Sequence, residues 1–131
     1  MKTILTLFVL FFSFALSAEI YFCVEDQLSG YKSPDHQKLV EFEPRRFKAN
    51  IDFDNNKLVS NDIFFKSTSI MGGNCSKSLT SLMTCNDAEG STFVISKLSN
   101  RFVYTSGFGY IYNQGDVVDD VYFSIGKCEK F

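Results

Sequence analysis

Two cysteines near opposite ends of the chain constrain its fold more than any other feature. Cys23 lies in the alternating stretch at residues 19–24, and Cys128 ends the alternating stretch at residues 120–128. Alternation with a period of two is typical of a half-buried β-strand, whose successive side chains point to opposite faces. In both stretches the cysteine lies on the face opposite the larger apolar side chains, so the two thiols can meet if the strands are neighbours. We therefore expect the first and last strands to lie side by side, joined by a disulfide.

The other two cysteines, Cys75 and Cys85, bracket a short polar stretch that reads as a hairpin. An even number of cysteines in an exported chain is typical of a disulfide framework, whereas zinc ribbons use paired C-x-x-C spacings that this sequence lacks. Three pairings are formally possible, and we favour Cys23–Cys128 with Cys75–Cys85. The chain-entropy model gives about 3 kcal/mol for the short loop and about 4–5 kcal/mol for the long one.

Residues 1–18 read as a signal peptide. Lys2 supplies the positive start, residues 4–14 are almost entirely apolar, and residues 15–18 (A-L-S-A) are small enough for cleavage. The apolar run is shorter than the roughly 20 residues that a membrane span needs. We expect a single domain at residues 19–131, periplasmic or secreted, without stable membrane insertion once the signal is removed.

The clearest hairpin spans residues 46–65. Phe47, Ala49, Ile51 and Phe53 alternate with polar residues and are expected to face the core. Residues 54–56 (D-N-N) supply turn chemistry, and residues 57–65 return as the partner strand, with a bulge near residues 61–62.

The rest of the chain supplies short strands separated by turns. Residues 25–38 are expected to form a polar connection that carries the only histidine, His36, and residues 39–42 a short strand. Further strands are predicted at residues 91–98 and 101–112, with the last turn at residues 113–116. The predicted fold class is all-β: a small antiparallel meander of seven or eight strands, a closed barrel or a sandwich, with two disulfides.

Several kinds of chemistry find no support in the sequence. The chain has 13 basic against 15 acidic residues, and this balance argues against nucleic-acid binding. Neither G-x-S-x-G nor H-E-x-x-H occurs. The run from Asp52 to Asn56 opens like a calcium loop, but Lys57 and Ile63 stand where such a loop needs Gly and Glu. We therefore predict no catalytic residues, no metal site and no cofactor.

One aromatic stretch stands out as a candidate binding site. In a continuous strand over residues 102–112 its aromatic side chains share one face, and tyrosine is favoured at binding surfaces because it combines a rigid apolar ring with a hydroxyl. Alternatively, the phenylalanines belong to the core and the tyrosines line the barrel wall. The residues predicted to bind are Tyr104, Phe108, Tyr110 and Tyr112.

The C-terminal portion, roughly residues 102–131, resembles small exported bacterial proteins of unknown function that end in G-x-C-x-x-F, here residues 126–131. That resemblance implies no activity. We expect an exported, non-catalytic domain that binds a protein or a component of the cell envelope. The alternatives are a small-ligand carrier of the lipocalin-like barrel type and an enzyme without a recognisable motif.

Overall fold

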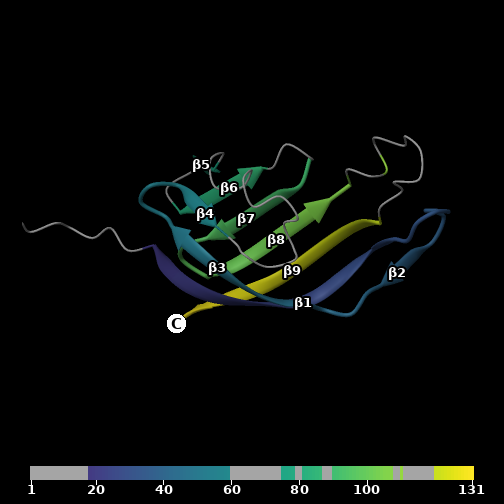
Figure 1. Ribbon diagram of the computed structural model, residues 1–131, viewed down its shortest axis with the longest axis horizontal. Helices are drawn as coiled ribbons and strands as arrows, with labels where there is room; N and C mark the ends of the chain where they lie inside the picture. The colour runs from purple at the N-terminus through teal and green to yellow at the C-terminus, as the bar shows by residue number, and fades with distance from the viewer. Residues whose placement is uncertain (1–17, 60–74, 79–80, 87–89, 108–109, 111–119) are drawn as a thin grey trace, which may run out of the picture.

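The fold consists of antiparallel strands, as a computed structural model of the chain shows (Figure 1). The structure describes residues 18–59, 75–78, 81–86, 90–107, 110 and 120–131. Within these residues the strands are β1 (Glu19–Tyr31), β2 (Leu39–Glu41), β3 (Arg46–Asp52), β4 (Lys57–Val59), β5 (Cys75–Ser78), β6 (Leu82–Asn86), β7 (Thr92–Ser96), β8 (Arg101–Ser106) and β9 (Val121–Lys130). In the described part of the chain, no helix has both the length and the apolar character needed to span a membrane.

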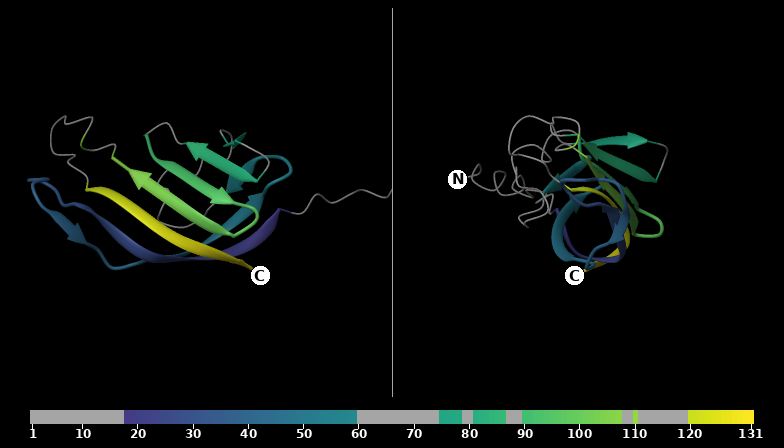
Figure 2. Two further views of the ribbon diagram at one scale, coloured as in Figure 1. Left: turned by 180° about the vertical axis from the view of Figure 1, so that it is seen from behind. Right: turned by 90° about the vertical axis from the view of Figure 1, so that its right-hand side faces the viewer.

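The strands form one sheet in the order β4-β3-β1-β9-β8-β7-β6-β5, and β2 pairs separately with β1. β1 is third in this order and has three partners. Its first half pairs with β3, its last residues pair with β2, and its other edge pairs with β9. Seen end-on, the sheet curls into a ring (Figure 2). The predicted all-β antiparallel fold is therefore confirmed, as a sheet nearly closed into a barrel.

Both predicted disulfides are confirmed. Cys23 and Cys128 are register partners on β1 and β9, with a Cα–Cα distance of 3.9 Å. Cys75 and Cys85 are register partners on β5 and β6, with a Cα–Cα distance of 4.0 Å. The first bond joins the two ends of the described domain, and the second closes the outermost hairpin of the sheet.

The expected polar connection after residue 24 is wrong in its first half, because β1 continues to Tyr31. A bulge between Glu25 and Gln27 shifts the register, and pairing with β9 then resumes as far as Tyr31 opposite Val121. Ser29 and Gly30, within the expected connection, belong to this strand. Its small residues allow close approach between strands rather than a chain reversal, as the geometry around Gly30 shows below.

The face of β1 and β9 that carries the cysteines points into the core, and the face with the larger apolar side chains points outward. Ile20 on β1, and Phe123 and Ile125 on β9, are exposed, whereas Cys23 and Cys128 are fully buried. Large buried rings come from the neighbouring strands. Phe47 on β3 is the register partner of Cys23, and Phe102 on β8 is the partner of Gly126. Because these rings fill the interior, the inward face of β1 and β9 has room only for small groups beside them.

The predicted hairpin is confirmed over its described part, β3 and β4. Phe47, Ala49 and Ile51 are buried and Phe53 packs against the core. In the turn, the carboxylate of Asp52 accepts hydrogen bonds from the backbone amides of Asp54 and Asn55, at 3.1 and 3.0 Å. The run that opens like a calcium loop thus forms a hairpin turn. The expected strand residues 60–65, their bulge and the last turn at residues 113–116 lie outside the described residues.

Candidate functional site

The four residues predicted to bind a partner fall into three groups. Tyr104 lies on β8, is 1% exposed and packs in the core. Tyr110 is 60% exposed. Phe108 and Tyr112 lie outside the described residues. The structure therefore does not place Tyr104 and Tyr110 on a common surface, because β8 ends at Ser106 and the continuous strand expected to align them is shorter than predicted.

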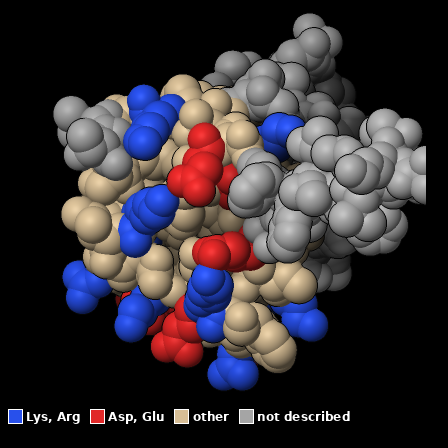
Figure 3. All heavy atoms as spheres, turned by 90° about the vertical axis from the view of Figure 1, so that its left-hand side faces the viewer, with Lys and Arg blue, Asp and Glu red and all other residues tan. Residues whose placement is uncertain are grey.

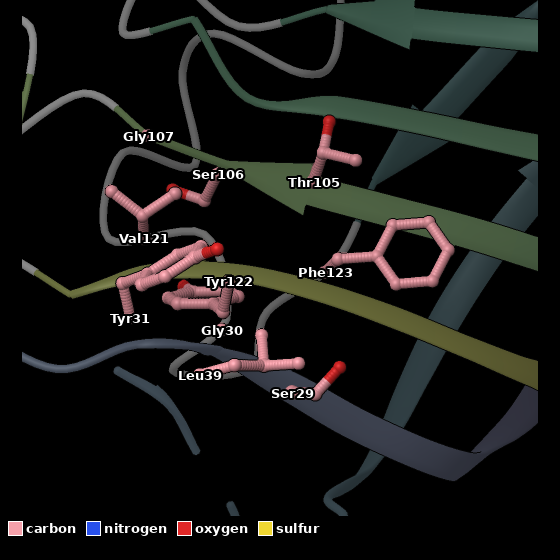
Figure 4. Close-up of a pocket in the computed structure, with 10 residues that line it drawn as sticks. All are labelled: Ser29, Gly30, Tyr31, Leu39, Thr105, Ser106, Gly107, Val121, Tyr122 and Phe123. Carbon is pink, nitrogen blue, oxygen red and sulfur yellow. The ribbon is translucent and has the colours of Figure 1, made fainter. Parts of the chain in front are cut away.

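An apolar groove with a volume of about 420 Å³ opens where β1 and β9 run out beyond the barrel (Figure 4). Leu39 on β2 is 67% exposed, Phe123 on β9 is 46% exposed and Tyr31 at the end of β1 is 41% exposed. Such a cluster of exposed large apolar side chains is typical of an interaction site. The described lining residues are Ser29, Gly30, Tyr31, Leu39, Thr105, Ser106, Gly107, Val121, Tyr122 and Phe123.

Gly30 makes the floor of this groove possible. A Cβ atom at this position would lie 2.0 Å from the carbonyl oxygen of Val121 and 2.6 Å from the Cα of Tyr122. Only glycine leaves room for β1 and β9 to approach this closely, and their approach puts Tyr31 opposite Val121 in the register.

A second hollow, of about 380 Å³, adjoins the groove and shares Tyr31 and Val121 with it. His36 and Tyr110 line it, with their ring centroids 5.1 Å apart in an edge-to-face arrangement. The carboxylate of Asp120 accepts a hydrogen bond of 2.6 Å from the backbone amide of Ser33, which ties the loop carrying His36 to the start of β9. The exposed Tyr110 therefore belongs to the same end of the molecule as the groove.

An ion pair between a fully buried Glu25 and a partly exposed Arg45 lies next to Tyr122 of the groove. The Glu25 side chain is fully buried and accepts hydrogen bonds from three nitrogens of Arg45: the backbone amide at 2.8 Å, Nε at 3.2 Å and Nη2 at 3.1 Å. Burial alone lowers the pKa of Arg45, but hydrogen bonding and attraction to the Glu25 carboxylate raise it above its ordinary value. The Arg45 side chain is 33% exposed, so the carboxylate is the fully buried member of the pair.

Tyr122 connects this ion pair to the groove. It lines the groove, and Cζ of the Arg45 guanidinium lies over its ring, 4.7 Å from the ring centroid. Its ring is 5.8 Å from that of Tyr104. Burial, and then the neighbouring Tyr122, raise the pKa of Tyr104 above its ordinary value. The position of Tyr122 in the groove is therefore supported by its contacts with Tyr104 and with the Glu25–Arg45 pair.

The electrostatic character of the groove differs from that of the opposite end of the molecule. All ten described lining residues are uncharged. At the opposite end, lysine and arginine side chains lie around the rim and acidic side chains nearer the middle, where undescribed residues do not cover them (Figure 3). An uncharged apolar groove can bury an apolar segment of a partner. Its described lining offers hydroxyls but no carboxylate, imidazole or thiol that could act as a base or nucleophile.

Sequence reasoning missed most of this site. Tyr31 lies within the segment predicted as a polar connection, and Leu39 directly follows it. Neither belongs to an aromatic cluster in the sequence. The position of Glu25 could have been inferred from the sequence. It follows Tyr21 and Cys23 at a spacing of two, so its carboxylate lies on the same, core-facing side of the strand.

Comparisons with protein-family models, with curated proteins and with solved structures found no match to this chain.

Proposed function

We propose that this protein is an exported, non-catalytic domain that binds a protein or a component of the cell envelope through the apolar groove. The observation that carries the proposal is the cluster of exposed Tyr31, Leu39 and Phe123 around a concave, uncharged surface, with exposed Tyr110 in the adjoining hollow. Such a surface contributes binding energy only when a partner covers it. Tyr110 belongs to the stretch that the sequence indicated for binding.

Two further observations support this proposal over a carrier that holds a ligand inside the barrel. The described interior is filled by close-packed rings, among them Phe47, Phe93 and Phe102. The concave surfaces open outward at the end of the sheet. Two disulfides are consistent with a periplasmic or extracellular site of action.

Site-specific photo-crosslinking in the source organism tests the proposal. A benzophenone amino acid at Leu39 should give a defined adduct with a partner. The same amino acid at Leu98, an 84% exposed leucine in the turn between β7 and β8, should give none, because it lies outside the groove lining.

The adduct should also weaken when Phe123→Ser is combined with the crosslinker at Leu39. Equal adducts from both positions, or none from Leu39, would overturn the assignment of the groove. Release of a co-purified small molecule on denaturation would instead support the carrier.

A further inference from the structure

A row of basic side chains crosses the outer face of the sheet on strands distant in sequence. Arg46 on β3 is the register partner of Val24 on β1, Val24 is the partner of Lys127 on β9, and Lys127 is the partner of Arg101 on β8. All three cations are exposed. The topology thus assembles a cationic row, Arg46–Lys127–Arg101, that no run of the sequence displays.

The folded protein gains nothing evident from this arrangement. Arg101 and Lys127 are directly opposite each other, and like charges in that position destabilise a sheet. None of the three forms an ion pair with any residue that the structure describes. The chain as a whole has more acidic than basic residues, so a basic row does not follow from composition.

Exposed apolar side chains border the cationic row on both sides. On one side Ile125 and Val103 are register partners, 36% and 37% exposed. On the other side are Phe22 and Ile20 of β1, both exposed. Ile125 and Phe22 are two positions from Lys127 and Val24 respectively, and therefore share their face of the sheet.

Among the residues that the structure describes in these rows, cations outnumber carboxylates. Lys48, the register partner of Phe22, adds a fourth cation. Glu129, the other partner of Phe22, and Asp26, the exposed residue in the bulge of β1, are the carboxylates in these rows. The described part of these rows thus holds four cations and two carboxylates.

We infer that this outer face docks on an anionic lipid surface. Cations near such a surface are attracted to its headgroups, and apolar side chains beside them gain by entering the boundary of the acyl region. A soluble polyanion satisfies the charges equally well but offers nothing to Ile125, Val103, Phe22 and Ile20. The combination therefore favours a lipid surface. The cationic row lies further along β8 and β9 than the groove lining, which shares this face of the sheet through Thr105 and Phe123. The two sites are therefore tested with separate variants.

Flotation of the oxidised protein with vesicles tests this inference. The protein should bind mixed phosphatidylcholine–phosphatidylglycerol vesicles, should not bind pure phosphatidylcholine vesicles, and should dissociate as salt is raised, since exposed charges are screened. Each cation near an anionic surface is worth roughly a fivefold change in partition, so Arg101→Gln with Lys127→Gln should lower binding roughly 25-fold.

Matched variants separate the possible outcomes. Lys57→Gln with Lys77→Gln removes two exposed cations on β4 and β5 and should leave binding unchanged. Ile125→Ser should weaken vesicle binding but not binding to soluble polyphosphate, and thermal unfolding checks that each variant is folded. Equal binding to both vesicle types, unchanged binding by the Arg101/Lys127 variant, or binding to polyphosphate alone would overturn the inference.

The proposal for the groove and the inference for the cationic row can be contradicted independently. Leu39→Ser should not alter vesicle binding, and the adduct formed from position 39 should persist when Arg101 and Lys127 are replaced by glutamine.

Discussion

Gly126 of β9 lies against the ring of Phe102, and a side chain at this position would have no space. A Cβ atom there would lie 2.2 Å from the carbonyl oxygen of Val24 and 2.6 Å from Cζ of Phe102. Gly126→Ala should therefore lower the free energy of unfolding by about 1–3 kcal/mol, the usual cost of overpacking. Urea denaturation measures the change.

Gly107→Ala is the matched control for this substitution. Its Cβ atom would meet its nearest neighbour, Cγ1 of Val121, at 3.8 Å, an ordinary contact. The control should stay within about 0.5 kcal/mol of the natural protein. Equal effects of the two substitutions would show that Phe102 does not lie over Gly126.

The Glu25–Arg45 pair gives a second prediction at this scale. Glu25→Gln leaves the Arg45 guanidinium without its carboxylate. Breaking a fully buried pair costs about 3–5 kcal/mol; we expect about 2–3 kcal/mol because the Arg45 side chain remains 33% exposed. Glu129→Gln, on an exposed position of β9, should change stability by less than about 0.5 kcal/mol. A Glu25 variant as stable as the Glu129 variant would contradict a buried pair.

Among the elements, the turn between β3 and β4 predicts a dependence of stability on pH. Hydrogen bonds from the Asn55 side chain, and then from backbone amides, hold the pKa of Asp52 below its ordinary 3.8. A carboxyl whose folded pKa is depressed contributes stability above its unfolded pKa and loses it as pH falls through the folded value. Asp52→Asn, which has no proton to bind, should lose less stability than the natural protein between about pH 6 and about pH 3.

Urea midpoints measured at both pH values check this. Lys97→Gln serves as the control. It removes the ion pair between Lys97 Nζ and Asp54 Oδ1, which are 3.2 Å apart, and leaves the hydrogen bonds of the Asp52 carboxylate in place. If the natural protein and the Asp52 variant lose the same stability between the two pH values, the Asp52 carboxylate does not stabilise the turn.

The sequence predicts a strand well when the strand's own residues determine which side chains are buried, and poorly when pairing with a distant strand determines this. The alternation of Phe47, Ala49 and Ile51 defines β3 because each side chain is buried or exposed by its own position. The strand predicted at residues 19–24 is shorter than β1, because the second half of β1 is held in the sheet by pairing with β9 and β2 rather than by a pattern of its own. The groove could not be predicted, since Leu39 and Phe123 line it together only because β1 pairs with β2 on one side and with β9, distant in sequence, on the other.

For the molecule as a whole, the two disulfides should contribute unequally. Cys23 and Cys128 are separated by 105 residues in the sequence, and Cys75 and Cys85 by 10. Replacing both members of the first pair by alanine should cost about 4–5 kcal/mol, and replacing the second pair about 3 kcal/mol, on chain entropy alone. Because Cys23 and Cys128 are also fully buried, lost packing adds to the first value. Denaturation midpoints of the two double variants compare the two losses of stability. A larger loss from replacing Cys75 and Cys85 would contradict the larger contribution of the disulfide that joins the two ends of the domain.

Both proposed surfaces require that β1 and β9 present their cysteines to the core and their larger apolar side chains to solvent. Hydroxyl-radical footprinting of the oxidised protein, read out by mass spectrometry, tests this orientation directly. The account predicts rapid oxidation of Phe22 and Phe123, with strong protection of Phe47 and Phe102. Protection of Phe22 and Phe123 to the same degree as Phe47 and Phe102 would contradict it.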